Sequence, residues 1–530
     1  MDTSRENKRQ ELQAKLDAVK TAGERNRLGQ FATPFDLALD MLAYAKEILP
    51  REVKISFFDP GFGTGAFFSA LIGAFSPKRI IEAEGFEIDP HYREPAIALW
   101  KDTSLLLHGT DFTQASPPEK DFEKHNLVIC NPPYVRHHHI PNGDKTRLQD
   151  LTERIFGERI SGLAGLYCYF LALSHLWMKE NGIAGWLIPS EFMDVNYGKP
   201  VKRYLLERVT LLRIHRFDPQ DVQFRDALVS SAVVWFRKAP PPSDHSVAFT
   251  FGGTLKQPKT SKVVSTEVLR NEPKWTRYPL AASRQRSAGA TLGDFFDIRR
   301  GLATGDNNFF VMPLKRIQAL GLPLNVFRPV LPSPRFLNVD EVLADKDGNP
   351  DLEPRTFLLD CRLSPDVVEK RYPRVWEYLE KGRREGVADR FLCKHRSPWY
   401  IQEYRPPSLF ICSYMGRGAA ERPSPFRFIL NHSKATVTNS YHLLYPRPDL
   451  EAALAADASL ARRIWMILRE IRPGAMTTEG RVYGGGLHKI EPKELSRVPA
   501  LAIARLLSLS RAHRRPQLEL FPESSASAPV

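Results

Sequence analysis

The 530-residue sequence has few cysteines, no long apolar run and no visible targeting segment. Its 5 cysteines are scattered, which argues against a disulfide framework or a paired-cysteine metal site and favours buried, reduced thiols. The longest apolar stretch, residues 165–178, contains His175 and falls short of the roughly 20 residues that a membrane-spanning helix needs. The first residues are polar and carry acids, so we expect no secretory signal and a cytoplasmic location.

The composition predicts a globular protein with an uneven distribution of charge. The sequence is 42% hydrophobic, 26% charged and 10% aromatic, which excludes a largely disordered or fibrous class. Residues 1–240 hold 31 Lys+Arg and 31 Asp+Glu, a balance of zero. Residues 241–530 hold the other 44 Lys+Arg and 30 Asp+Glu, and so carry the whole net charge of +14. This asymmetry favours a C-terminal half that binds a polyanion, and a basic surface without a partner is the alternative.

Short apolar runs alternate with helical segments through the first 240 residues. The runs KISFFDP, EGFEID, SLLLHGTD, LVICNPP, AGWLIP and LRIHRFD predict strands that are buried on both faces. This alternation predicts an α/β fold with a doubly wound, mostly parallel, Rossmann-like sheet. Its last strand, VSSAVVWFRK, follows a short loop, so we expect it to pair antiparallel at or near the edge of the sheet.

Consecutive prolines at positions 240–242 mark the predicted end of this first domain. We therefore expect a first domain over residues 1–240 and a connecting segment with some strand over residues 241–290. An Arg- and aromatic-rich α+β domain is expected over residues 291–515, and a disordered tail over residues 516–530.

A glycine-rich turn follows the first expected strand. Asp59 and Pro60 lead into Gly61, Gly63 and Gly65. Glycines at the carboxyl end of such a strand let the backbone approach a nucleotide or nucleoside closely. The spacing matches neither the GxGxxG dinucleotide fingerprint nor a phosphate-binding P-loop.

Acidic residues end the next two strands. Glu87, in GFEIDP, can accept hydrogen bonds from both hydroxyls of a ribose. Asp111, in HGTDF, can accept an adenine amino hydrogen while the ring of Phe112 packs against the base. Each acid alone is also compatible with an ordinary solvated strand end, but three consecutive strand ends of this chemistry favour a nucleoside site.

The sequence NPPY, residues 131–134, closes the fourth strand. Two adjacent prolines stiffen the turn and leave the side-chain oxygen of Asn131 and the carbonyl of Pro132 as outward acceptors. Two acceptors that hold the hydrogens of a planar amine, such as adenine N6, favour a pyramidal nitrogen that can attack a methyl sulfonium. Tyr134 offers a stacking face, and a rigid loop without function is the alternative.

These motifs, in this order, resemble the amino-group DNA methyltransferases, specifically the N6-adenine enzymes of type II restriction-modification systems with a C-terminal target-recognition domain. Residues 29–34 (GQFATP) resemble the family's N-terminal cofactor motif, and residues 222–225 (VQFR) resemble the loop whose aromatic residue packs on a flipped base. Residues 300–310 (RGLATGDNNFF) and 483–490 (YGGGLHKI) resemble segments of the recognition regions. The resemblance implies site-specific methylation of adenine N6 in double-stranded DNA by S-adenosylmethionine, after base flipping.

The resemblance also implies two sets of site residues. The implied catalytic residues are Asn131, Pro132, Pro133, Tyr134 and Phe224. The implied contacts to S-adenosylmethionine are Gln30, Thr33, Asp59, Pro60, Gly61, Gly63, Gly65, Phe67, Glu87, Ile88, Asp111, Phe112 and Asn131. We expect no metal site, because the consecutive histidines His137–His139 rarely converge on one ion, and we expect them to contact DNA instead.

Double-stranded DNA is the expected partner, with a cognate restriction endonuclease as a functional partner and no membrane. The tail sequence QLELF, from Gln517 to Phe521, resembles the short peptide by which bacterial DNA-processing proteins dock onto the replicative sliding clamp. A tail that merely packs or floats is the alternative.

Other functions remain open at this point. A cytosine-N4 DNA methyltransferase and an RNA or protein-glutamine N-methyltransferase share the NPPY chemistry, and a non-catalytic DNA-binding protein shares the basic half. The GQFATP segment and the basic C-terminal half count against a protein methylase. We expect no fused nuclease, because no convincing carboxylate-lysine cluster appears in the sequence.

Overall fold

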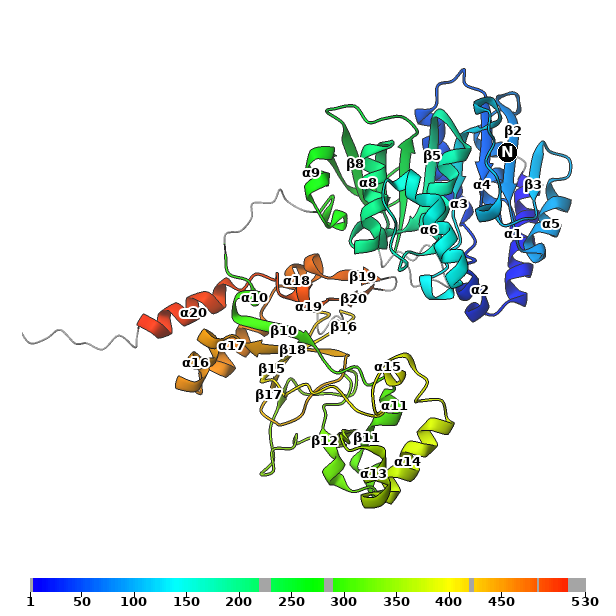
Figure 1. The fold of residues 1–530 in the computed structure, drawn as a ribbon. Coiled ribbons are helices and arrows are strands. Elements are labelled where there is room, and N and C mark those ends of the chain that lie inside the picture. Colours follow the sequence, from blue (N-terminus) through cyan, green and yellow to red (C-terminus); the bar gives the residue numbers. More distant parts are fainter. Residues whose placement is uncertain (1–2, 219–229, 281–288, 419–423, 484–485, 513–530) are drawn as a thin grey trace, which may run out of the picture. The chain divides into compact units, whose positions relative to one another are not determined.

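A computed structural model describes residues 3–218, 230–280, 289–418, 424–483 and 486–512 of the protein. The chain divides into two compact units (Figure 1). The first comprises Met1–Arg284 with Tyr483–Gly485, and the second comprises Gln285–Val482 with Gly486–Val530. Within the described ranges, none of the helices is both long and apolar enough to cross a membrane.

The first unit is built on one nine-stranded sheet with the order β3-β2-β1-β4-β5-β7-β6-β8-β9 (Figure 1). Strands β1 to β5 run parallel to one another, and β7 is antiparallel to both β5 and β6. The strands are β1 (Ile55–Asp59), β2 (Ile80–Phe86), β3 (Leu105–His108), β4 (His125–Cys130), β5 (Met178–Pro189), β6 (Thr210–Arg216), β7 (Ser231–Arg237), β8 (Ser246–Gly253) and β9 (Pro258–Ser265).

Helices on both faces of this sheet explain why its central strands are apolar on both sides. Phe57 of β1 packs in a core with residues of α3 and α4, whereas the next residue, Phe58, packs in a core with residues of α6, α7 and α8. The predicted doubly wound α/β fold is therefore confirmed. The helices are α1 (Thr3–Val19), α2 (Ala22–Leu28), α3 (Phe35–Ile48), α4 (Ala66–Ala74), α5 (Pro90–Trp100), α6 (Asn142–Phe156), α7 (Leu166–Ser174), α8 (Lys199–Glu207) and α9 (Thr266–Asn271).

The antiparallel strand β7 lies inside the sheet, between β5 and β6, and not at its edge. Two further strands from residues 241–290, the expected connecting segment, extend the sheet beyond β6. Strand β8 pairs parallel with β6, and β9 pairs antiparallel with β8. Alternate residues of β8, including Val247 and Phe249, are buried in the same core as α8, which explains why this segment joins the sheet.

The second unit has the α+β organisation that the sequence predicts (Figure 1). It contains a five-stranded sheet of order β10-β18-β15-β17-β13 and two three-stranded sheets of order β11-β14-β12 and β16-β20-β19. The strands are β10 (Phe296–Arg300), β11 (Val311–Pro313), β12 (Phe327–Pro329), β13 (Glu341–Val342), β14 (Thr356–Leu359), β15 (Phe410–Ser413), β16 (Met415–Gly416), β17 (Phe428–Asn431), β18 (Tyr441–Pro446), β19 (Arg481–Tyr483) and β20 (Leu487–Lys489). The helices are α10 (Leu292–Phe295), α11 (Asn307–Phe310), α12 (Leu314–Ala319), α13 (Pro365–Arg371), α14 (Pro373–Arg384), α15 (Phe391–Lys394), α16 (Pro448–Ala456), α17 (Leu460–Arg469), α18 (Pro473–Glu479), α19 (Pro492–Leu495) and α20 (Leu501–Ala512).

Candidate active site

The glycine-rich turn and the NPPY loop lie side by side, because they follow the neighbouring parallel strands β1 and β4. A Cβ atom on Gly61 would lie 3.2 Å from the carbonyl oxygen of Asn131, so the two loops are in backbone contact. Gly63 and Gly65 have positive φ angles of 56° and 89°, a conformation that glycine adopts without strain. The sheet therefore brings the predicted cofactor turn and the predicted catalytic loop together at its carboxyl edge.

One buried and one partly buried acid lie at this edge. Asp59 is 1% exposed, its Oδ1 accepts a hydrogen bond from the backbone N–H of Gly61 at 3.1 Å, and burial raises its pKa to about 7. The carboxylate of Glu87 accepts hydrogen bonds from the N–H of Gly63 at 2.9 Å and of Asp89 at 2.8 Å, and burial raises its pKa too. Glu87 thus ties the turn after β1 to the turn after β2, and each of its oxygens keeps capacity for a further hydrogen bond.

The apolar side chains of the predicted cofactor set differ in exposure. Ile88, directly after Glu87, is 60% exposed and offers an open apolar surface beside the acid. Phe112 is 3% exposed within an aromatic cluster, and Phe67, a residue of α4, is 2% exposed in the core. Asp111 accepts a hydrogen bond from the N–H of Thr113 at 2.8 Å and so fixes the turn that carries Phe112.

The Asn131 side chain is fixed by the segment GQFATP. Its amide nitrogen donates to the carbonyl oxygen of Phe31 at 2.9 Å and to Oγ1 of Thr33 at 3.1 Å. Because a carbonyl can only accept, the amide oxygen of Asn131 must face the other way. That oxygen is buried and has no hydrogen-bond partner in the described part of the chain, which costs about 1–3 kcal/mol.

Tyr134 lies largely inside the protein. It is 7% exposed, its hydroxyl donates to the carbonyl oxygen of Leu187 at 3.0 Å, and its ring lies 5.7 Å from that of Phe31. Its backbone N–H donates to the carbonyl oxygen of Gly29 at 3.1 Å. Pro132 is buried beside it, whereas Pro133 is partly exposed.

Gly29 allows the close approach between GQFATP and NPPY. It has a positive φ of 67°, and a Cβ there would lie 2.3 Å from the backbone nitrogen of Tyr134. No side chain other than glycine's fits that space.

Gln30 belongs to a polar cluster with Lys20 and Asp89. Its Nε2 donates to Oδ2 of Asp89 at 2.8 Å, and Lys20 donates to its Oε1 at 3.0 Å and pairs with Asp89. Although burial opposes it, these bonds hold the pKa of Asp89 below its usual value. Lys20 and Asp89 were not predicted as site residues, although an acid directly before Pro90 was a recognisable helix cap.

Other predicted features fall outside this cluster. His137–His139 form a short 3-10 helix after NPPY, and no group of three potential ligands that could hold a metal occurs among the residues described. Phe224 and the segment from Gln517 to Phe521 lie outside the described residues.

The two predicted recognition segments meet within the second unit. The guanidinium of Arg300, from residues 300–310, lies 3.9 Å from the centre of the Tyr414 ring. Lys489, from residues 483–490, lies 5.2 Å from the same ring centre and pairs with Glu491 at 3.0 Å. Tyr414 donates its hydroxyl to Glu491 at 2.9 Å. Two segments almost 190 residues apart in sequence thus form one basic and aromatic cluster.

Comparison with protein families gives two matches along the chain. Residues 80–223 match the family model of the Eco57I restriction-modification methylase. Residues 273–519 match the model of the C-terminal domain of the type II methyltransferase M.Eco57I.

Individual relatives extend this similarity to nearly the whole chain. The type II methyltransferase M.AccI of Acinetobacter calcoaceticus is 27% identical over 498 residues, which cover 89% of this chain and 85% of that protein. M.XamI of Xanthomonas campestris pv. amaranthicola is 27% identical over 505 residues, 92% of this chain and 86% of that protein.

Among solved structures, the fold is similar to the type IIL restriction-modification enzyme MmeI, whose structure was determined in complex with DNA. The TM-score is 0.52 at 14% identity, and the match covers 84% of this chain and 66% of the MmeI chain. The present chain therefore spans slightly less than two thirds of that larger enzyme, and the likeness concerns the fold.

Proposed function

This chain is related along nearly its whole length to the type II restriction-modification methyltransferases, and we propose that it transfers the methyl group of S-adenosylmethionine to adenine N6 in double-stranded DNA. In this proposal the protein is the modification enzyme of a restriction-modification system. A restriction endonuclease that cuts the same DNA sequence would be its functional partner.

The residues at the carboxyl edge of the sheet fit such a cofactor. The glycine turn leaves room for a close backbone approach, and the acid Glu87 lies beside the exposed apolar surface of Ile88, as a ribose and an adenine ring require. S-adenosylmethionine would supply an electrophilic methyl group on a sulfonium. Gln30 and Thr33 would help to hold its methionine end, because their side chains join the Asp89 turn and the NPPY loop, respectively.

The single observation that carries the proposal is the unpartnered oxygen of Asn131. A buried acceptor without a donor is unfavourable, and proteins keep such groups mainly where a ligand supplies the partner. An amino hydrogen of the target base would satisfy this oxygen, and the neighbouring carbonyl of Pro132 would accept the second hydrogen. Asn131 would then orient the amine and stabilise the positive charge that develops on nitrogen during transfer.

The target base would have to leave the DNA helix to reach this site. A stacked and paired adenine cannot bring its amino group to a loop at the edge of a sheet, so base flipping is part of the proposal. Tyr134 would contact the everted ring by the small exposed part of its side chain, since the rest is buried. Phe224 is proposed as the second contact, from the similarity of its sequence alone.

The second unit is proposed to bind the DNA. Residues 285–530 hold 37 Lys+Arg and 27 Asp+Glu, a balance of +10, and the cluster of Arg300, Tyr414 and Lys489 combines basic and aromatic groups. Neutralising 6–10 phosphates would make the affinity for DNA fall by about 10³-fold or more between 50 and 200 mM salt. A binding titration at several salt concentrations measures this slope, and an affinity independent of salt would contradict the proposal.

The decisive experiment is base-resolved detection of modified bases in DNA from cells that express this chain. We expect N6-methyladenine at one recurring sequence, and its loss in cells that express the Asn131→Ala variant. N4-methylcytosine at that sequence would favour the cytosine-N4 alternative. Unmodified DNA together with methylated RNA or protein would reject a DNA methyltransferase.

Docking of the segment from Gln517 to Phe521 onto a sliding clamp remains a prediction from the sequence. A pull-down with the clamp tests it, by comparing the full chain with a variant in which Leu520 and Phe521 are replaced by alanine. Equal capture of both chains would reject it.

A further inference from the structure

The helix α1 precedes GQFATP and all the later motifs in the sequence, yet its side chains are hydrogen-bonded to the glycine-rich turn. Arg9 and Glu6 are 3% and 4% exposed and form a buried ion pair with an N–O distance of 2.7 Å. Arg9 also donates to the hydroxyl of Thr64, in the turn after β1, at 3.1 Å. The same hydroxyl donates to Oε1 of Gln13 at 2.7 Å, so α1 holds the turn through two side chains.

The same helix is hydrogen-bonded to α5, the helix that follows β2. Asp17 accepts hydrogen bonds from Nε2 of Gln13 and from the hydroxyl of Tyr92 in α5, both at 2.9 Å. A continuous chain of polar contacts therefore runs from the glycine turn through Gln13 and Asp17 to α5. Helix α1 spans the two turns that carry the predicted cofactor residues.

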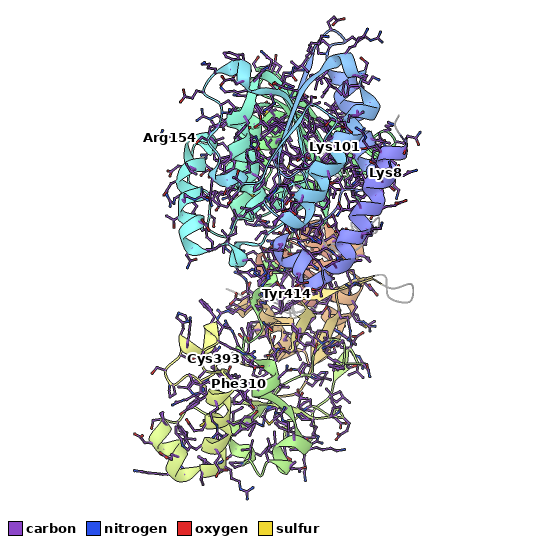
Figure 2. The ribbon with its side chains drawn as sticks, turned by 90° about the vertical axis from the view of Figure 1, so that its right-hand side faces the viewer. Lys8, Lys101, Arg154, Phe310, Cys393 and Tyr414 are labelled. Atoms are coloured by element: carbon purple, nitrogen blue, oxygen red, sulfur yellow. The ribbon has the colours of Figure 1, made fainter. Side chains whose placement is uncertain are left out.

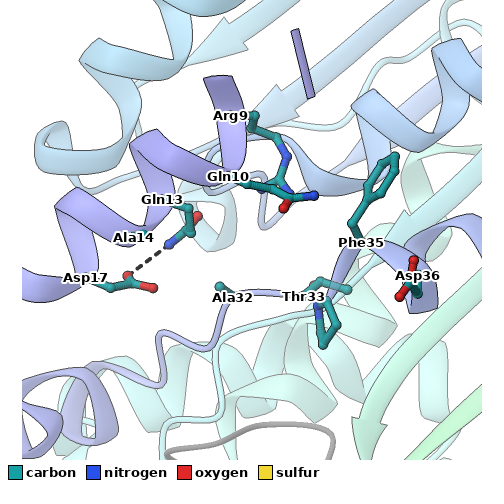
Figure 3. A pocket seen from close by; sticks show the side chains of 10 residues that line it. Arg9, Gln10, Gln13, Ala14, Asp17, Ala32, Thr33, Phe35 and Asp36 are labelled. Carbon is teal, nitrogen blue, oxygen red and sulfur yellow. Dashed lines mark hydrogen bonds between the residues drawn. The ribbon is translucent and has the colours of Figure 1, made fainter. Parts of the chain in front are cut away.

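A pocket of about 370 Å³ opens between α1 and residues 32–36 (Figure 3). It is lined by Arg9, Gln10, Gln13, Ala14, Asp17, Ala32, Thr33, Pro34, Phe35 and Asp36. One wall residue, Thr33, accepts a hydrogen bond from the amide of Asn131, and another, Gln13, accepts one from Thr64. The pocket is thus bounded by groups that contact the transfer loop on one side and the glycine turn on the other.

The charges of this pocket select a cationic, hydrogen-bonding ligand. The guanidinium of Arg9 is already paired with Glu6. Arg25 donates to the backbone carbonyl of Asp17 and not to its carboxylate, and the carboxylates of Asp17 and Asp36 form no ion pair within the described residues. Amide and hydroxyl groups of Gln10, Gln13 and Thr33 add neutral donors and acceptors. The α-ammonium group of an amino-acid tail matches these carboxylates, and its α-carboxylate would accept from a neutral donor such as the hydroxyl of Thr33.

Building on the proposed function, we infer that α1 forms the wall of the cofactor site at its amino-acid end. Asp17 receives the α-ammonium group of S-adenosylmethionine, and Gln13 positions Asp17 and the glycine turn around that end. The adenosine end of the cofactor lies beside Glu87 and Ile88. Residues 3–19 are therefore part of the cofactor site although they carry none of the motifs.

Two ligands separate this role from general support of the fold. S-adenosylhomocysteine carries the amino-acid tail, whereas 5′-methylthioadenosine lacks it and shares the nucleoside. The variant Asp17→Asn keeps an oxygen that can accept from Tyr92 and Gln13 but removes the charge. As a control, Lys8→Ala changes an exposed side chain of the same helix (Figure 2).

Calorimetric titration of the full chain with each ligand gives the answer. We expect Asp17→Asn to raise the dissociation constant of S-adenosylhomocysteine by about tenfold or more. The dissociation constant of 5′-methylthioadenosine should stay within about twofold of its value for the unaltered chain. Lys8→Ala should change neither. Gln13→Ala, like Asp17→Asn, should weaken the binding of S-adenosylhomocysteine.

Three other outcomes of the titration would contradict the inference or the proposed function. Equal weakening of both ligands by Asp17→Asn would mean that α1 only supports the fold, and unchanged binding of S-adenosylhomocysteine would remove Asp17 from the site. Either result overturns the inference while leaving the proposed function intact. If the unaltered chain binds neither ligand, the proposed function itself fails.

Discussion

Replacing Asn131 by alanine is expected to abolish most activity with little effect on stability. The substitution removes two hydrogen bonds, to Phe31 and Thr33, each worth about 1 kcal/mol. It also removes the buried oxygen without a partner, whose presence costs about 1–3 kcal/mol. These contributions nearly cancel, so the free energy of unfolding should change by no more than about 1 kcal/mol.

The effect on methyl transfer should be far larger. If Asn131 stabilises the charge that develops on the amine, its loss should lower the rate by roughly 10²–10³-fold, as for other preorganised polar groups in active sites. The rate is measured as transfer of a labelled methyl group to DNA that contains the modified sequence, and stability as the midpoint of thermal unfolding. DNA affinity should stay within about twofold of the original chain.

Asn431 provides a matched control. It is 2% exposed, and both polar atoms of its side chain are hydrogen-bonded, among others to Ser433 and Ala435. Asn431→Ala should therefore lower the unfolding midpoint clearly, because it removes satisfied bonds and leaves buried groups unpaired. The reasoning is refuted if Asn131→Ala destabilises the protein as much as Asn431→Ala, or if it retains full activity.

Four further substitutions test the site. Glu87→Ala should weaken cofactor binding at least tenfold in a calorimetric titration, because a carboxylate that holds the glycine turn is lost, and an unchanged dissociation constant would contradict its role. Gly29→Ala should destabilise the NPPY loop and abolish methyl transfer, since its Cβ would lie 2.3 Å from the nitrogen of Tyr134. Gly63→Ala, with a positive φ and open space, should lower the free energy of unfolding by only about 1–2 kcal/mol. An equal loss of stability in the two variants would reject the clash at Gly29. Because burial raises the pKa of Asp59 to about 7, the folded protein holds this proton more tightly than the unfolded chain, so its stability contribution is present at low pH and is lost as pH rises from about 4 to 7. The unfolding midpoint of Asp59→Asn relative to the original chain should therefore rise between about pH 4 and 7 and level off above, and a constant difference over that range would contradict the raised pKa.

The parts of the fold that the sequence predicted are those set by local patterns. Doubly buried strands and a glycine turn leave short, recognisable runs, and the fold class that follows from them is confirmed by the sheet order. The juxtaposition of the glycine turn and NPPY also follows, because neighbouring parallel strands end at one edge.

The parts that could not be predicted depend on contacts between distant segments. Strand β7 lies inside the sheet because residues 246–265, beyond three prolines, supply two more strands, and no local pattern specifies that pairing. Likewise, the bonds of Lys20 to Asp89 and of Arg9 to Thr64 join residues more than 50 positions apart. The burial of Tyr134 and Phe112 was not visible either, because an aromatic residue after a strand is compatible with both a core and a ligand surface.

The pairing of β8 with β6 sets a limit on how this protein can be shortened or recombined. A chain cut at Pro240 would leave the backbone groups of β6 without their neighbour, an open edge that invites aggregation. It would also remove Trp275, which is fully buried, and the carbonyl of Pro273 that binds Lys202 in α8. Hybrid chains made by exchanging the second unit between relatives should therefore be joined after residue 280, so that the whole sheet stays with its own parent.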